Sequence, residues 1–274
     1  MSSWRLINTG FLTAPENMAI DESLLANFDP DSSPPILRLY GWDPPALSIG
    51  RFQDAAAQID LERCRMDLVP LVRRITGGGA IYHSDELTYS VVCSSEQIGA
   101  LSTVKESFRA LTGFILEFYR KKGFEAAYAA DIHQGEKNSG ERVPYCFAGR
   151  EAFDILIRGR KIGGNAQRRE RGIIFQHGSI PMINRSLKGL SYMRDKRAEL
   201  VESTVSIAEC LGVCPAVAAD FRFLLAEELK ESFCSSFSTT LFETPLSPDE
   251  KRKAASLLGK KYLDDRWNIE GMKI

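Results

Sequence analysis

Two segments of this chain carry apolar residues at the three-and-four spacing of a helix face. In residues 103–122 the spacing is sustained throughout, and Thr103 with Glu106 supplies a capping box at the start. A second box of the same kind opens the segment 13–28, whose apolar residues also gather on one face. Both segments are predicted to be helices.

Short apolar segments rich in β-branched and aromatic residues predict strands. Turn formers such as the WDPP sequence at 42–45 separate them. Residues 152–162, AFDILIRGRKI, predict a hairpin that turns at Gly159. The other predicted strands are WRLINTG (4–10), ILRLYG (36–41), ALSIG (46–50), LVRRI (71–75), LTYSVVC (87–93) and GIIFQHGSI (172–180).

The pattern becomes mainly helical after about residue 195. The helical segments there are 199–211, 221–233 and 247–263. These elements together predict an α+β fold, a mixed β-sheet with packed helices. A chain of 274 residues can bury a sizeable core, so we expect a single domain over 1–274, with 195–274 as a mainly helical C-terminal extension.

The composition argues against several classes of partner. Apolar residues make up 44% of the chain, but no apolar run approaches the ~20 residues of a membrane helix. The start, MSSWRLINTG, lacks the basic and apolar regions of an export signal, so we expect a cytoplasmic protein with no membrane partner. The 35 basic and 36 acidic residues give no indication of nucleic acid binding.

Positive charge is nevertheless concentrated in one stretch. Between Arg158 and Arg171 there are six basic residues and a single acid, Glu170. Such a patch suits an acidic partner protein, although a solvated basic face would give the same sequence.

Cysteine usage points to one candidate nucleophile. The six cysteines show no C-x-x-C spacing and are too sparse for a disulfide scaffold, and with only three histidines a metal site has little support. Cys146 differs from the others, because it follows Pro144 at the end of a polar loop and has Arg142 and Arg150 within four residues. Nearby cations lower the pKa of a thiol, and a thiolate attacks thioesters well.

The sequence RRITGGGAIYH places Arg73 and Arg74 beside Gly77, Gly78 and Gly79. Each glycine lowers the stability of a regular element by roughly 0.5–1 kcal/mol relative to alanine, because its backbone loses more conformational entropy on folding. Some other interaction must therefore favour three glycines here. A bulge or tight turn would need only one or two glycines. The other interpretation is an acyl group or similar ligand that lies on the bare backbone, with the arginines holding its anionic or carbonyl part.

A lysine followed by two glycines ends the predicted hairpin, in the sequence KIGGNAQ that begins at Lys161. Most lysines are solvated surface charges, but this one could reach a cleft whose floor is main chain. His83 and His177 admit two interpretations, as bases or as hydrogen-bonded strand residues, and spacing alone favours the second.

These motifs together resemble one family. RRITGGGAIYH followed by LTYS, then GRKIGGNAQ, then QHGSI, is similar in order and spacing to the lipoate–protein ligase A and octanoyltransferase family, which shares its catalytic fold with biotin protein ligases. The resemblance covers residues 4–185 well and the helical tail more loosely. It implies a biotin/lipoate protein ligase-like catalytic domain.

The segment PYCF, with Lys161 fifteen positions after Cys146, resembles the cysteine-dependent octanoyltransferases of that family. The resemblance implies that Cys146 accepts octanoate from octanoyl-acyl carrier protein as a thioester, while Lys161 polarises the acyl carbonyl. The acceptor would be a lysine of a lipoyl domain, such as that of the glycine-cleavage carrier protein, and no cofactor or metal would be needed. The resemblance assigns these residues to the acyl site: Arg73, Gly77, Gly78, Gly79, His83, Gly163, Gly164, Asn165 and His177.

Other functions stay open at this point. In an ATP-dependent lipoate ligase, Lys161 would bind an acyl-adenylate and Cys146 would be incidental. A lipoyl-domain amidotransferase would also use a cysteine but would move the acyl chain between carrier domains. A non-catalytic acyl-binding or carrier-docking protein would keep the scaffold alone. The Gly163-Gly164-Asn165 turn also departs from relatives that often carry a Gly-Ser or Ser-Gly pair.

Overall fold

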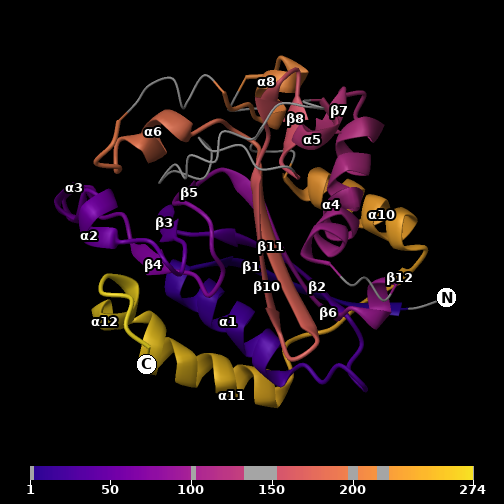
Figure 1. The fold of residues 1–274 in the computed structure, drawn as a ribbon, viewed down its shortest axis with the longest axis horizontal. Helices are drawn as coiled ribbons and strands as arrows, with labels where there is room; N and C mark the ends of the chain where they lie inside the picture. The colour runs from indigo at the N-terminus through magenta and orange to yellow at the C-terminus, as the bar shows by residue number, and fades with distance from the viewer. Residues whose placement is uncertain (1–2, 100–102, 133–152, 197–202, 215–221, 274) are drawn as a thin grey trace.

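A central six-stranded sheet crosses the molecule, and helices lie on both of its faces (Figure 1). The computed structural model describes residues 3–99, 103–132, 153–196, 203–214 and 222–273. No helix in this described part of the chain has the length and apolar content needed to cross a membrane.

The central sheet is mixed, with strand order β10-β11-β6-β2-β1-β12. Strand β1 pairs in parallel with β2 and β12, whereas the pairs from β2 through β6 and β11 to β10 are antiparallel. The strands are β1 Ser3–Leu12, β2 Ile36–Trp42, β6 Glu86–Ser94, β10 Gly164–Glu170, β11 Ile173–Pro181 and β12 Thr240–Glu243. The predicted α+β class with a mixed sheet is therefore confirmed.

Two three-stranded sheets accompany the central one. In the first, β3 (Ala46–Ile49) lies between β4 (Leu71–Arg73), which is parallel to it, and β5 (Ile81–His83), which is antiparallel. The second is antiparallel and has the order β7-β8-β9. Its strands are β7 Ala126–Tyr128, β8 Ile155–Ile157 and β9 Arg160–Lys161.

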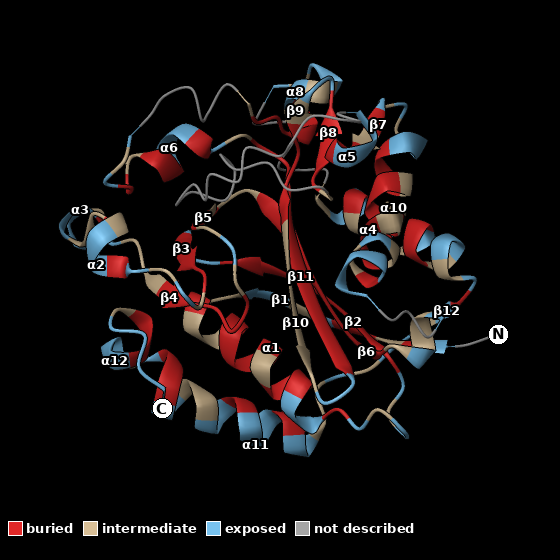
Figure 2. Ribbon diagram, in the orientation of Figure 1, coloured by how far each residue is buried: buried red, intermediate tan, exposed pale blue. Residues whose placement is uncertain are grey.

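The two faces of the central sheet pack against different helix pairs. Helices α4 (Val104–Lys121) and α10 (Arg222–Phe237) lie on one face, where Phe233 contacts both Trp4 and Phe114 with ring centroids 4.9 and 5.0 Å apart. Helices α1 (Ala14–Asn27) and α11 (Pro248–Leu257) lie on the other (Figure 1). Strands β2, β6 and β11 are buried at every residue because both of their faces are covered (Figure 2).

Short helical turns complete the fold. They are α2 Ala55–Gln58, α3 Leu61–Met66, η1 Glu96–Ile98, α5 Ala129–Ile132, α6 Ser186–Leu190, α8 Ile207–Leu211, the π-helical η2 Leu258–Tyr262 and α12 Asp265–Asn268.

Both predicted capping boxes form. The Thr103 hydroxyl accepts a hydrogen bond from Glu106 N at 3.1 Å, and Thr13 N donates to the Glu16 carboxylate at 3.0 Å. The hairpin also turns where predicted, with Arg158 and Gly159 at positive φ between β8 and β9.

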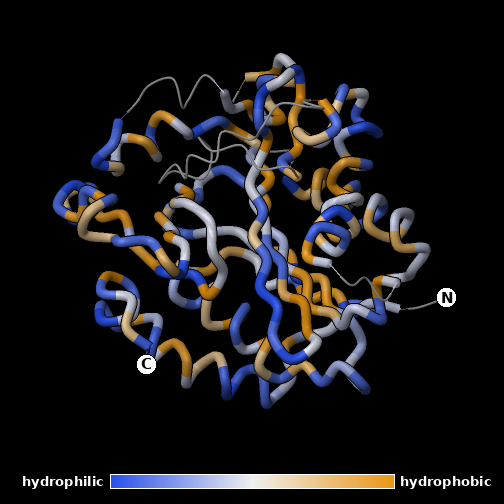
Figure 3. Tube along the Cα trace, viewed as in Figure 1, coloured by the Kyte–Doolittle hydropathy of each residue, from blue (hydrophilic) through white to orange (hydrophobic). Residues whose placement is uncertain are grey.

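Several features of the fold differ from the prediction, including strands β5 and β7, which lie outside the predicted strands. The C-terminal extension contributes a strand, β12, to the central sheet. Residues 203–206 are not helical, because Lys161 N donates to Ser203 O and Val205 N donates to Lys161 O, so this segment pairs with β9 instead. Strand β10 was not predicted, because its sequence, GNAQRRE, is polar (Figure 3). A polar sequence is common in a strand at the edge of a sheet.

Candidate active site

A cavity opens between the central sheet and the β4-β3-β5 sheet. Residues of four adjacent central strands, β10, β11, β6 and β2, line it together with β5, Arg74 and one residue of α1. Four of the predicted site residues are among those that line it: His83, Gly164, Asn165 and His177. The motifs found in the sequence therefore converge on one place.

His83 is held on both of its ring nitrogens. Its ring stacks on Trp42 with centroids 3.8 Å apart, Nδ1 lies 2.7 Å from Glu86 Oε1 and Nε2 lies 2.6 Å from Ser48 Oγ. Burial raises the pKa of Glu86, but the charge on His83 and hydrogen bonds from His83, Thr88 and Ser179 outweigh it and lower that pKa. Glu86 is therefore a buried carboxylate that fixes the orientation of His83.

His177 is held in a second network on the same wall. Its Nε2 lies 2.7 Å from Thr76 Oγ1 and its Nδ1 lies 3.3 Å from Asp21 Oδ2. Asp21, on α1, also accepts from Arg38 at 2.7 Å and from the Tyr40 hydroxyl at 2.9 Å. Burial lowers the pKa of His177 and outweighs the opposing effect of Asp21, so His177 favours its neutral form.

Many residues of the cavity wall are polar, but the surface that they expose to the cavity is mainly apolar. The Trp42 indole donates to Thr88 Oγ1 at 2.7 Å, and the Tyr89 hydroxyl donates to Asn165 Oδ1 at 2.7 Å. Because these polar atoms bond to one another, they offer few partners to a ligand. Such a wall suits a hydrocarbon chain better than a polar molecule.

Arg73 does not reach this cavity. Its buried guanidinium donates to the carbonyls of Gly50, Arg51 and Gln53 on one side and to those of Trp267 and Ile269 on the other. It therefore ties the C-terminal segment to the turn after β3, which differs from its predicted place in the acyl site.

Arg74 is the arginine of the pair that lines the cavity. Its Nη1 donates to Ser48 Oγ at 2.8 Å, and its Nη2 donates to the carbonyls of Gly77 and Gly79 at 2.9 and 3.0 Å. Gly78, at φ +91°, packs against Gly50. The three glycines are outside the cavity lining, and the main chain of Gly77 and Gly78 lies close to Gly50.

Gly50→Ala is expected to destabilise the protein, because the new Cβ would lie 2.0 Å from Gly78 O. We expect the free energy of unfolding, measured by urea denaturation, to fall by about 1–3 kcal/mol, which is typical of an overpacked core. The matched control is Gly113→Ala in α4, where no atom outside the helix backbone lies within 4 Å of the new Cβ. The control should raise stability by up to about 1 kcal/mol. Unchanged stability of Gly50→Ala would contradict this packing.

Lys161 lies on β9, close in sequence to the cavity wall. Its Nζ forms an ion pair with Asp154 Oδ2 at 2.8 Å, and both side chains are buried, with 3% and 8% of their surface exposed. Gly163 follows at φ +83°, where a Cβ would lie 2.2 Å from Ser179 O, so this position requires glycine. The next residue, Gly164, pairs with Ser179 and lines the cavity.

Cys146, the predicted acyl acceptor, lies outside the described residues.

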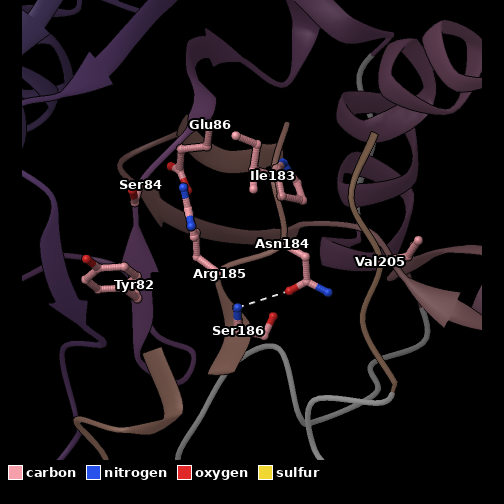
Figure 4. A pocket seen from close by; sticks show the side chains of 9 residues that line it. Tyr82, Ser84, Glu86, Ile183, Asn184, Arg185, Ser186 and Val205 are labelled. Carbon is pink, nitrogen blue, oxygen red and sulfur yellow. Dashed lines mark hydrogen bonds between the residues drawn. The ribbon is translucent and has the colours of Figure 1, made fainter. Parts of the chain in front are cut away.

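Glu86 lines a second hollow (Figure 4). Ile183, Asn184 and Val205 contribute to its wall, and Ser186 N donates to Asn184 Oδ1 at 3.0 Å. Val205 N also donates to Lys161 O at 2.9 Å. The hollow therefore adjoins the strand that carries Lys161.

The basic run does not form one face. Arg160 pairs with Glu209 and Arg168 pairs with Glu170, while Arg169 donates to the carbonyl of Thr103. The basic residues between Arg158 and Arg171 are distributed from the β8–β9 turn along β10, so their side chains are farther apart in the structure than the sequence suggests.

Comparison with known proteins identifies the family. Residues 13–230 match the family model for the lipoyl protein ligase A/B catalytic domain. The chain belongs to this family. An octanoyltransferase LipM from Kyrpidia tusciae is 36% identical over 98% of this chain and 99% of its own. The LipM protein of Geobacillus kaustophilus is 34% identical over 97% of this chain and 98% of its own.

Solved structures of the lipoyl protein ligase A/B family share the fold. A Thermoplasma acidophilum protein with bound lipoic acid superposes with a TM-score of 0.78 at 26% identity, covering 98% of this chain and all of the other. The predicted lipoate protein ligase-like catalytic fold is confirmed by this family membership.

Sequence reasoning missed several residues that build this family member's site. Glu86, Asp21 and Asp154 are buried carboxylates that hold His83, His177 and Lys161 respectively. Glu86 directly precedes a predicted strand and Asp154 lies within the predicted hairpin 152–162, and an acidic residue at such an apolar position is the signal that could have identified them. Asp21 lies in the middle of a predicted helix, where a carboxylate is usually solvated and therefore gives no signal.

Proposed function

We propose that this chain is a cytoplasmic octanoyltransferase that moves an octanoyl group from octanoyl-acyl carrier protein to a lysine of a lipoyl domain. The observation that carries the proposal is identity of 36% with an octanoyltransferase over nearly the whole of both chains. The cavity supports it, because the bonded polar groups of its wall leave an apolar surface for the acyl chain. The proposal treats 1–274 as one catalytic domain, since β12 joins the central sheet.

In the first proposed step the Cys146 thiolate attacks the carbonyl carbon of the donor thioester. A new C–S bond forms to Cys146, the C–S bond to the carrier breaks, and the carrier thiolate leaves and takes up a proton. The Lys161 ammonium would stabilise the negative charge that develops on the carbonyl oxygen. Asp154, 2.8 Å from Nζ, would hold that ammonium in place.

In the second step the acceptor lysine amine attacks the Cys146 thioester. A C–N bond forms, the C–S bond to Cys146 breaks, and the proton lost by the amine returns to the departing thiolate. The two steps exchange a thioester for an amide and consume no nucleotide. Lipoyl-domain proteins, including the glycine-cleavage carrier protein, are the proposed acceptors.

A comparison of donors tests this function. Octanoyl-acyl carrier protein should add one octanoyl group to the enzyme, seen by intact mass, and should then octanoylate a lipoyl domain without ATP. Octanoylation from octanoate plus ATP alone would identify a ligase instead. Preference for an octanoylated glycine-cleavage carrier protein as donor would identify an amidotransferase.

A further inference from the structure

The cavity runs across the central sheet from β10 to β2. Its lining residues follow the strand register: Gly164 pairs with Ser179, Ser179 with Thr88, and Thr88 with Tyr40. Adjacent strands lie about 4.8 Å apart, so the three steps span about 14 Å. One end lies three residues from Lys161 along the chain, and the other end lies at β2.

Met18 lines the cavity on the side of strand β2. It is the lining residue that α1 contributes, and it is 2% exposed. The neighbouring Asn17 donates to Gly41 O of β2 at 2.9 Å, which holds this turn of α1 over β2. Met18 therefore lies near β2, which is three strand steps from β10, the strand that begins at Gly164.

The span of the four strands that line the cavity is comparable to the length of a short acyl chain. An extended chain advances about 1.2 Å per bond, so the seven carbon–carbon bonds of an octanoyl group span about 8 Å. The radii of the terminal methyl group and of the carbonyl end of the chain occupy much of the remaining length. With the carbonyl end near Lys161, the far end of such a chain would therefore lie on the β2 side of the cavity, where Met18 is part of the wall.

The wall around Met18 has little freedom to yield. Tyr40 and His177 are both bonded to Asp21, which is itself paired with Arg38. Moving these side chains would break buried hydrogen bonds, whereas the methionine side chain has no such bonds to lose.

We propose that Met18 sets the maximum length of the acyl chain, whose terminal methyl lies against it while the thioester lies at the Lys161 end. This inference rests on the proposed function and names a specificity-determining residue for it. Shortening the side chain at position 18 should admit longer acyl groups, and enlarging it should exclude octanoate.

Rates of enzyme acylation by hexanoyl-, octanoyl-, decanoyl- and dodecanoyl-acyl carrier protein test the inference by intact mass. Met18→Ala should raise the rate with decanoyl relative to octanoyl donor by about tenfold, as expected when two methylenes regain burial. Met18→Phe should shift the preference toward hexanoyl donor. If Met18→Ala does not fold, Met18→Val provides a smaller enlargement of the same end, with the same expected direction.

Met193→Ala is the matched control, because Met193 is 1% exposed but packs around β3 and is outside the cavity lining. Its donor preference should equal that of the unmodified protein. If the unmodified protein accepts octanoyl donor while Met18→Ala and Met18→Phe keep its donor order, the Met18 inference is wrong. If the unmodified protein accepts no acyl donor, the proposed function itself fails.

Discussion

Cys146→Ala should accept no octanoyl group from octanoyl-acyl carrier protein and should transfer none to a lipoyl domain. The proposed reaction passes through a thioester on this sulfur, and alanine offers no nucleophile in its place. Intact mass of the enzyme after incubation with donor measures the first step, and intact mass of the lipoyl domain measures the second. Both signals should fall below detection.

Cys214→Ala is the matched control for this variant. Cys214 is the exposed cysteine among those that the structure describes, so a general requirement for a surface thiol would also affect it. Burial raises the pKa of Cys64 to about 11 and also raises the pKa of Cys93, which makes both poor nucleophiles near neutral pH. Undiminished transfer by Cys146→Ala would overturn the covalent mechanism.

Local sequence signals predicted the elements that depend on local interactions. The capping boxes at Thr13 and Thr103 and the turn at Gly159 formed as predicted, because each involves atoms a few residues apart. Strand β12 and the segment 203–206 were not predicted. Their conformations depend on pairing with β1 and β9, which are remote in sequence, and such pairing overrides local preference.

The candidate site was predicted in outline but not in its contacts. The motifs located His83, Gly164, Asn165 and His177, which the fold brings to one cavity. The sequence could not tell the adjacent arginines apart, because their different surroundings depend on the fold: Arg73 ends β4 and contacts the C-terminal segment, whereas Arg74 follows the strand and lines the cavity.

Lys161→Met should reduce octanoyl transfer by about 10²–10³-fold, the usual effect of removing one group that stabilises a developing oxyanion. It should also reduce stability by about 3–5 kcal/mol, because Asp154 loses the ammonium that lies 2.8 Å from its carboxylate in a buried site. Transfer is measured with octanoyl-acyl carrier protein and a lipoyl domain, and stability is measured by urea denaturation. Lost activity from this variant alone would not separate the two effects.

The double variant Lys161→Met with Asp154→Asn separates catalysis from stability. Asparagine removes the buried negative charge that the methionine leaves behind, so most of the lost stability should return. The transfer rate should stay as low as in Lys161→Met, because the double variant still lacks an ammonium to polarise the carbonyl. Recovery of the rate together with stability would show that Lys161 only supports the fold, and the proposed chemical role of this lysine would then be wrong.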